Sequence, residues 1–195
     1  MIEPRRQVKD RRIEKTQSLL REALVSLIHE KPYDAIAITE ILERANVGRS
    51  TFYAHFHDKD DLLTSGIHHM LRLPQSMEPP SSMKLPERVI WFSLPIFEYH
   101  RHRRTSGLKT SAKGRMIIHE HLRRVLVEMI ACELRKEYRH TSAHQISPDL
   151  LVQYVASTFI LVLNWWTESQ SPLSPDEVNA LFRGLIQPTL NSIFA

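Results

Sequence analysis

Apolar residues recur every three or four positions along most of the chain, a spacing typical of amphipathic helices. Residues 9–30 form one such stripe, which Pro32 ends, and residues 38–45 form a shorter one. Runs of alternating β-branched residues are few, so the pattern does not favour a sheet. We therefore expect an all-α protein of about nine helices.

A tight turn and a third helix are expected directly after residue 45. Asn46 stands where this turn needs left-handed backbone, which asparagine tolerates better than most residues other than glycine. Gly48 is then the expected N-cap of a helix over residues 49–56. Because that helix is too short to be stable alone, we expect Phe52 and Phe56 to anchor it by packing inward.

The following segment divides the chain into two predicted domains. Asp58 caps a fourth helix that continues to about residue 72, and the proline- and serine-rich segment 73–86 is interpreted as a joint. The sequence therefore predicts a small helical domain over residues 1–63, extended by the fourth helix to about residue 72, and a larger helical domain over residues 73–195.

The larger domain is predicted to contain helices with recognisable ends. A fifth helix starts at about residue 87 and kinks at Pro95, and a long amphipathic helix covers residues 115–138. Ser147 and Ser174, each followed by proline, are the expected N-caps of the last two helices, and Ser174 also begins a capping box. Pro188 is expected to bend or interrupt the final helix.

The formal charge of +4 is unevenly distributed along the chain. Residues 1–15 carry six Lys and Arg against three acidic residues, and residues 101–139 carry eleven against four. A basic N-terminal arm suits a partner with phosphate groups, since each neutralised phosphate releases counterions. A solvated charged tail has the same composition, so charge alone leaves both interpretations open.

Three sequence features bear on where the protein resides. Cys132 is the only cysteine, so no internal disulfide can form, and the arginine-rich N-terminus lacks the apolar stretch of a signal peptide. Both features favour the cytoplasm. Residues 150–167 are uncharged, but their polar members and acidic flanks favour a buried helix at a dimer interface over a membrane span. The core helix of a monomer is the alternative to that interface.

Enzyme and metal motifs are missing from the sequence. The five glycines form no dinucleotide-binding loop, no phosphate-binding loop and no nucleophile elbow. The histidine pairs at 68/69, 100/102 and 119/121 stand one or two positions apart, so a helix would turn each pair onto different faces. We therefore expect no catalytic residues, no cofactor and no metal site.

The expected third helix carries side chains suited to DNA. Arg49 at its start can form two hydrogen bonds to guanine O6 and N7, and Ser50 and Thr51 can bond to bases or phosphates. Tyr53 offers a rigid ring and a hydroxyl to a phosphate or a thymine methyl group. Each residue singly is more often a solvated side chain, so the inference depends on their occurring together.

The joint pattern resembles the recognition-helix signature of the TetR/AcrR family of transcriptional regulators. The signature occupies residues 45–56, which read Ala-Asn-Val-Gly-Arg-Ser-Thr-Phe-Tyr-Ala-His-Phe, and the resemblance extends over about residues 13–63. It implies a three-helix helix-turn-helix domain with DNA contacts at Arg49, Ser50, Thr51, Tyr53, His55 and Lys59. Ala37 stands where family members usually have a phosphate-contacting threonine, and Thr39 is a candidate substitute.

The same resemblance implies a C-terminal domain that binds a ligand and forms a homodimer. Candidate residues of an apolar ligand cavity, each more often plain core, are Trp91, Phe92, Phe97, Tyr99, Cys132 and Asn164. Candidates for a four-helix dimer interface of the last two helices are Tyr154, Phe159, Val162, Trp166, Leu181, Phe182 and Leu185.

The sequence therefore predicts a cytoplasmic TetR-like regulator, interpreted as a repressor, that binds a palindromic double-stranded DNA operator as a homodimer. An unidentified small-molecule effector or partner protein would release or modulate it, and no membrane partner is expected. The alternative is a protein-interaction regulator that keeps the fold but acts through a partner protein in place of a small molecule.

Overall fold

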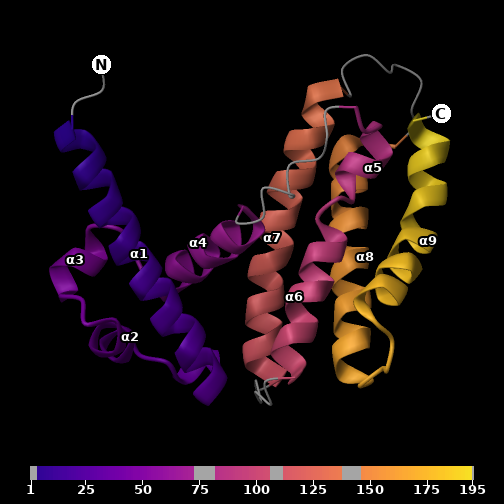
Figure 1. Cartoon of the computed structure of the whole chain (residues 1–195). Coiled ribbons are helices and arrows are strands. Elements are labelled where there is room, and N and C mark those ends of the chain that lie inside the picture. The colour runs from indigo at the N-terminus through magenta and orange to yellow at the C-terminus, as the bar shows by residue number, and fades with distance from the viewer. Residues whose placement is uncertain (1–3, 73–81, 106–111, 138–145, 195) are drawn as a thin grey trace. The chain divides into compact units, whose positions relative to one another are not determined.

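The computed structural model describes residues 4–72, 82–105, 112–137 and 146–194, which are helical apart from turns and short loops (Figure 1). These residues contain no strand, and the predicted all-α fold is confirmed. In chain order the helices are α1 (Pro4–Glu30), the 3-10 helix η1 (Tyr33–Ala35), α2 (Ile38–Ala45), α3 (Arg49–Tyr53), α4 (Lys59–Arg72), α5 (Leu85–Val89), α6 (Ser93–Thr105), α7 (Ala112–Glu137), α8 (Pro148–Glu168) and α9 (Pro175–Phe194).

The chain forms two compact units. The first holds the described residues up to 68 together with residues 112–121, and the second holds the remainder, so the division falls within α4 and within α7. In the first unit, Lys113 of α7 pairs with Asp34 at 2.9 Å, and His121 Nδ1 lies 2.9 Å from Thr64 Oγ1 of α4. The start of α7 therefore belongs with the N-terminal helices, which the hydrophobic pattern did not indicate.

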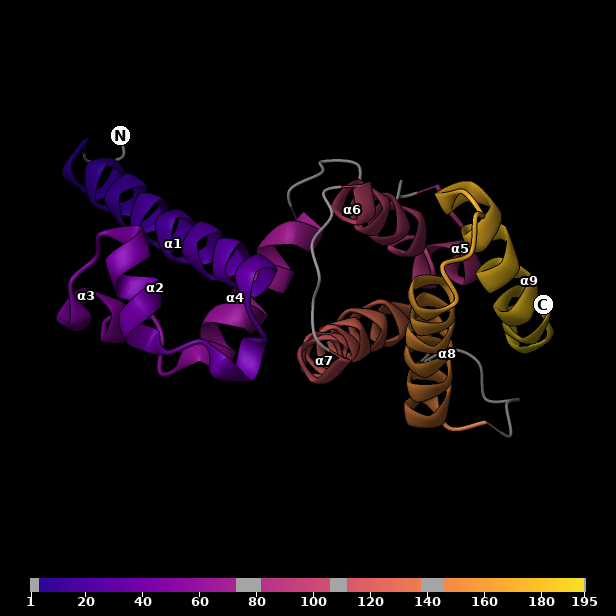
Figure 2. The same cartoon turned by 90° about the horizontal axis from the view of Figure 1, so that it is seen from below.

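The core of the first unit is built on the apolar stripe of α1, which lies beside α2 (Figure 2). Leu20 and Leu24 of α1, Ile41 of α2, Phe52 of α3 and Leu62 of α4 are each at most 2% exposed. Each of the four helices thus contributes a fully buried side chain, as expected when short helices depend on shared packing for their stability.

Polar contacts fix α2 against the end of α1. Arg44 of α2 forms an ion pair with Glu30 through two guanidinium nitrogens and donates a further hydrogen bond to Ser26 Oγ at 2.8 Å. Lys31 pairs with Glu40 near the start of α2. These bonds lower the pKa of Glu30 and Glu40, because a carboxylate that accepts hydrogen bonds from a cation is stabilised in its charged form.

Aromatic rings fill the centre of the second unit. The Phe159 ring of α8 has its centroid 5.1 Å from that of Phe92, 4.9 Å from that of Phe97 and 5.3 Å from that of Phe182. The Trp166 ring stands perpendicular to Phe97 at 5.7 Å. Such pairs contribute about 0.5–1.5 kcal/mol each beyond their burial. Residues of α6, α8 and α9 therefore share one aromatic core.

The predicted helix starts at the two serines are confirmed. Ser147 Oγ accepts a hydrogen bond from the Leu150 amide at 3.2 Å, and Pro148 is the first residue of α8. Before α9, Ser174 Oγ accepts from the Glu177 amide at 3.3 Å, while the Glu177 carboxylate accepts from the Ser174 amide at 2.7 Å. This reciprocal pair is the capping box, and it lowers the pKa of Glu177.

Helix boundaries differ from the prediction near two prolines. Residues 90–92 interrupt the helix and separate α5 from α6, so the chain does not form one helix kinked at Pro95. Pro95 is the third residue of α6, where the backbone N–H has no helical acceptor to lose. Pro188 lies inside α9, which continues to Phe194, so the expected interruption does not occur.

Other boundaries shift by smaller amounts. Helix α1 begins at Pro4 and α7 at Ala112, both earlier than expected. Most of the predicted joint at 73–86 lies outside the described residues, and α5 begins within its last part, at Leu85.

By length and composition, α8 is the one helix among the described residues that is apolar enough to cross a membrane. Its buried residues include Val155, Phe159, Leu163 and Trp166, which pack in the second unit. We interpret α8 as a core helix of that unit, since one of its faces is buried there while Leu161 and Trp165 remain exposed.

Candidate nucleic-acid interface

The turn between α2 and α3 has the geometry that the sequence predicts. Asn46 follows α2 with left-handed backbone, at φ 52° and ψ 47°. The amides of Asn46 and Val47 donate to the carbonyls of Glu43 at 3.2 Å and Leu42 at 3.0 Å, which closes the end of α2. Gly48 is the N-cap of α3, with extended backbone. The predictions for Asn46 and Gly48 are confirmed, and together these residues set the direction of α3.

Aromatic packing holds α3 from its inner side. Phe52 is fully buried and Phe56 is 4% exposed, with ring centroids 5.8 Å apart. The helix ends at Tyr53, earlier than predicted, because the amides of His55 and Phe56 both bond to the Phe52 carbonyl and form a turn. The predicted inward packing of the two phenylalanines is confirmed, and it fixes a helix that is too short to persist alone.

The outer side of α3 carries exposed polar residues. Arg49, Ser50, Thr51 and Tyr53 all lie on the surface of the first unit, and Tyr53 is 47% exposed. The Tyr53 ring packs edge-on against the buried Phe52 ring, with centroids 5.2 Å apart. The guanidinium carbon of Arg49 lies 6.0 Å from the Tyr53 centroid. The exposed arginine is thus held near an aromatic ring that is itself held by the core.

Two further predicted DNA contacts lie outside α3. His55 is half-buried just after α3, with its ring 6.4 Å from that of Phe56. Thr39 is exposed in the first turn of α2. The Ala37 amide before that turn donates to the Glu40 carboxylate at 2.9 Å, whereas the Ala37 side chain at the N-cap accepts no hydrogen bond from the first turn of α2.

Lys59 differs from the other predicted contacts, because its side chain turns into the first unit. Its ammonium group donates to the carbonyl oxygens of Tyr33 at 2.7 Å and Ile36 at 2.9 Å. Burial lowers the pKa of Lys59, against the opposing effect of the Asp60 carboxylate. The sequence indicated the position of Lys59 at the start of α4, but not these backbone acceptors.

Tyr33 is a central residue of the first unit that the sequence analysis missed. Its side chain is 2% exposed, and its hydroxyl donates to Asp60 Oδ1 at 2.5 Å. Burial and this hydrogen bond raise the pKa of the phenol. A single tyrosine directly after a proline belongs to no periodic stripe, so the hydrophobic pattern gives no signal for its burial.

The ligand-cavity candidates are dispersed in the second unit. Phe92 and Phe97 belong to the aromatic core, Trp91, Tyr99 and Asn164 are half-buried, and Cys132 is exposed on α7. Two of the six are thus buried in that core, and the side chains of the other four retain exposed surface.

The dimer-interface candidates fall into two groups. Phe159, Trp166 and Phe182 are at most 1% exposed, and Val162 is 6% exposed, so these four belong to the core of a single chain. Tyr154, Leu181 and Leu185 are exposed. A side chain with no exposed surface cannot contact a second copy unless the core repacks, so the exposed group is the one available to a partner.

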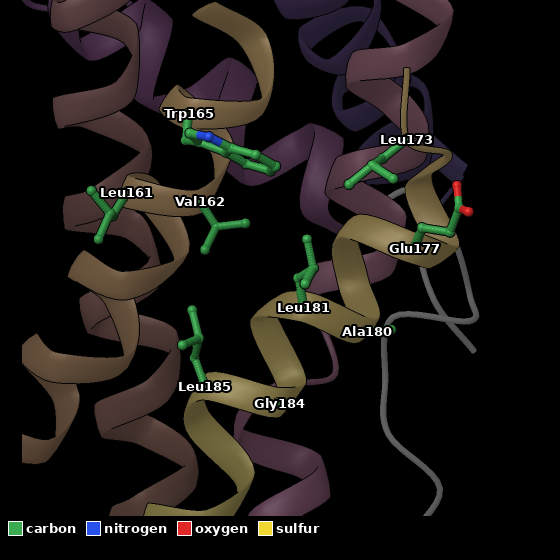
Figure 3. A pocket seen from close by; sticks show the side chains of 9 residues that line it. All are labelled: Leu161, Val162, Trp165, Leu173, Glu177, Ala180, Leu181, Gly184 and Leu185. Atoms are coloured by element: carbon green, nitrogen blue, oxygen red, sulfur yellow. The ribbon is translucent and has the colours of Figure 1, made fainter. Parts of the chain in front are cut away.

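An apolar groove lies between α8 and α9 (Figure 3). Its volume is about 910 Å³, and its lining residues are Leu161, Val162, Trp165, Leu173, Glu177, Ala180, Leu181, Gly184 and Leu185. In Figure 3 the side chains of Trp165 and Leu181 project toward the space between the two helices. The sequence analysis missed Leu161 and Trp165, which neighbour the buried Val162 and Trp166.

Metal-binding side chains do not gather in the part of the chain that the structure describes. No three His, Cys, Asp or Glu residues there are placed to hold one metal ion. His119 and His121 of α7 are both buried, and His121 is engaged with Thr64 as described above.

These features define a class of protein: an all-helical protein whose first unit is a helix-turn-helix domain with an exposed third helix. Residues 20–65 match the family model described as bacterial regulatory proteins, tetR family. The first unit therefore carries the DNA-binding domain of the TetR family of transcriptional regulators, as the signature at residues 45–56 predicted. Family and fold point to a transcription regulator, a class that is normally not enzymatic.

A curated relative shares the N-terminal segment. An uncharacterized HTH-type transcriptional regulator of Bacillus subtilis (strain 168), YxbF, is 37% identical to the chain over 59 residues. The match covers 30% of this chain and 16% of that protein, so the chain spans only a small part of the relative's length.

Two solved structures share the fold over both units. A TetR transcriptional regulator from Streptococcus agalactiae 2603V has a TM-score of 0.52 and 24% identity, over 92% of this chain and 98% of that one. RolR in complex with the ligand resorcinol has a TM-score of 0.50 and 19% identity, over 94% of this chain and 89% of that one. At these identities the similarity establishes the fold alone.

Proposed function

We propose that the chain is a repressor that binds a palindromic DNA operator as a homodimer through α3. The observation that supports this most directly is the exposed outer side of α3, where Arg49, Ser50, Thr51 and Tyr53 stand on a helix anchored by Phe52. In a helix-turn-helix the N-terminal residues of the second helix reach base edges in the major groove. Arg49 occupies the first position of that helix, where a guanine contact is favoured.

Phosphate contacts from neighbouring surfaces would fix the protein on the duplex. Thr39 is exposed on α2, His55 is half-buried just after α3, and Arg11, Arg12 and Lys15 are exposed on α1. Helix α3 has no acidic residue to repel phosphates. Because each neutralised phosphate releases counterions, binding should weaken steeply as the salt concentration rises.

Dimerisation through the apolar groove would supply two α3 helices to one operator. Leu161 is 65% exposed, Trp165 46%, Leu181 47% and Leu185 54%, and clustered apolar exposure of this kind is typical of an interface. A Cβ added at Gly184 would meet no heavy atom within 4 Å, so a partner helix has room to approach closely. A twofold dimer reads an inverted repeat, which is why a palindromic operator is expected.

A ligand bound by the second unit would modulate DNA binding. The structural neighbour that holds resorcinol supports a small-molecule effector for this fold, and the half-buried Trp91, Tyr99 and Asn164 are our candidates for contacting it. An effector that binds one conformation a hundredfold better than the other shifts the equilibrium by about 2.7 kcal/mol. The protein would work in the cytoplasm, where its operator is accessible.

Selection of binding sites from random duplex DNA tests this function. We expect enrichment of an inverted repeat and sedimentation of two protomers per duplex. The double substitution Leu181→Glu/Leu185→Glu should separate the protomers and weaken binding to the repeat by about a hundredfold or more. Leu150→Glu, at a 62% exposed apolar residue outside the groove, is the matched control. Absence of any enriched sequence would contradict the proposal.

The second candidate is a regulator of the same fold that acts through a partner protein in place of a small molecule. The apolar groove favours this candidate too, since a protein segment with an apolar helix face would fit it. Sedimentation separates the two: this candidate predicts a monomer that forms a one-to-one complex with its partner, and only sequence-independent affinity for DNA.

A further inference from the structure

The ammonium group of Lys59 contacts two backbone acceptors and an aromatic ring of its own chain. Two of its hydrogen bonds go to the Tyr33 and Ile36 carbonyl oxygens, at 2.7 and 2.9 Å. The same nitrogen lies 4.4 Å from the centroid of the Tyr33 ring, within the range of a cation–π contact. A lysine ammonium has three N–H donors, so two are committed to backbone and the ring covers a further side.

The two carbonyls mark the two ends of η1. Tyr33 is its first residue, and Ile36 follows its last, directly before the Ala37 N-cap of α2. A single side chain from the start of α4 therefore holds both ends of the segment that delivers the chain into α2. Since α2 and the Asn46 turn determine the direction of α3, a displacement of this segment moves the whole helix-turn-helix.

A second contact from α4 reinforces the first. Asp60, the next residue, accepts the hydrogen bond from the Tyr33 hydroxyl at 2.5 Å. Tyr33 is thus fixed at its carbonyl and ring face by Lys59 and at its hydroxyl by Asp60, while its side chain is 2% exposed. Hydrogen bonds from a charged donor to backbone acceptors are among the stronger ones in proteins.

We propose that Lys59 is a positioning residue, which holds η1 and the entry of α2 against the start of α4, and that it does not bind a DNA phosphate. This inference rests on the proposed function only where it concerns DNA. It assigns the first residue of α4 a role in the free protein, because its acceptors lie within the same chain.

The full-length variant Lys59→Met, which keeps the length and the apolar stem of the side chain, tests this in two ways. Without DNA, amide exchange at Ala35 and Ile36, whose N–H groups bond to Pro32 and Tyr33 carbonyls, should accelerate about tenfold or more. With DNA, affinity should fall while the slope of log K against log salt stays as in the wild type, since no phosphate contact is lost. Lys59→Gln, which keeps N–H donors, should lose less protection at both amides.

Arg49→Met is the matched control, because Arg49 is exposed and should alter DNA affinity without altering exchange at residues 35 and 36. The proposal is overturned if exchange in Lys59→Met equals that of the wild type, or if the salt slope falls by about 0.9 per protomer in either Lys59 variant.

Unfolding of the first unit in Lys59→Met supports it, since a solvent-facing phosphate ligand does not hold a fold, and Lys59→Gln then supplies the salt slope. If the wild type itself shows no salt-sensitive DNA binding, the proposed function fails, whereas the exchange measurement still decides the role of Lys59.

Discussion

The guanidinium carbon of Arg49 lies 6.0 Å from the centroid of the Tyr53 ring, one helical turn further along α3. The ring in turn packs edge-on against Phe52, which is fully buried. An arginine placed over an aromatic face keeps its charge while losing some of its rotational freedom. The side chain that we expect to bind guanine is therefore partly ordered before DNA arrives.

Arg49→Ala should weaken binding to the selected operator by about 1–3 kcal/mol, or roughly 5- to 150-fold, because it removes a two-bond contact with a guanine. Tyr53→Phe, which keeps the ring and removes the hydroxyl, should cost less, about 0.5–1.5 kcal/mol. Fluorescence anisotropy with labelled duplexes measures both changes. Thermal unfolding should match the wild type, since both side chains are exposed, and equal operator affinity in all three proteins would exclude α3 as the reading surface.

Phe52→Ala should destabilise the first unit by about 3–5 kcal/mol, because the ring is fully buried and anchors a five-residue helix. Tyr53→Ala is the neighbouring control, and its loss should be well under half as large, since that ring is 47% exposed. Urea unfolding followed by circular dichroism gives both values. Equal losses for the two substitutions would mean that α3 is not held from its inner side.

Asn46→Ala should destabilise the first unit by about 1 kcal/mol, because alanine pays a steric penalty at the φ of 52° that this turn requires. Asn46→Gly removes that penalty and should be neutral or slightly stabilising. The midpoints of urea unfolding should decrease in the order glycine variant, wild type with asparagine, alanine variant. An alanine variant as stable as the glycine variant would contradict a left-handed turn here.

Tyr33 should make the first unit sensitive to alkali. Its folded pKa lies above the ordinary value of 10.0, so its contribution to stability is present below pH 10 and is lost as the pH rises further. Lys59 has the opposite effect on the pH dependence of stability, because its pKa is lowered in the folded protein. Lys59 is present in both the wild type and Tyr33→Phe. The difference in unfolding free energy between these two proteins should therefore shrink above pH 10.

Tyrosinate absorbance during the same titration gives an independent check. In the wild type one phenol should ionise only as the first unit unfolds, and Tyr33→Phe should lack this late component. A late component that persists in Tyr33→Phe would assign it to another tyrosine and would refute the burial of Tyr33.

Sequence reasoning was sufficient where a local rule decides the structure. Asn46, Gly48 and the serine caps before α8 and α9 depend on backbone conformation and on hydrogen bonds within three residues, which can be inferred from sequence. The helix break before α6 could not be placed the same way. Proline is tolerated in the first turn of a helix as well as at a kink, so Pro95 fits both arrangements.

The contacts of Lys59 and Tyr33 lay beyond sequence reasoning for a different reason. Their partners are separated by more than twenty positions along the chain, and two of the acceptors are backbone carbonyls, which carry no residue-type signal. Helix α8 presents a third case. Because it is apolar on most sides, its sequence does not distinguish Trp165, which is exposed, from Trp166, which is buried.

Chemical protection of guanine N7 on the selected operator tests the central claim most directly. We predict that the wild type protects guanines in two major-groove patches about 10 base pairs apart, related by the twofold symmetry of the repeat, and that Arg49→Ala loses protection at one guanine in each half-site while still occupying the DNA. A single patch, or the same protected guanines in Arg49→Ala, would contradict the account.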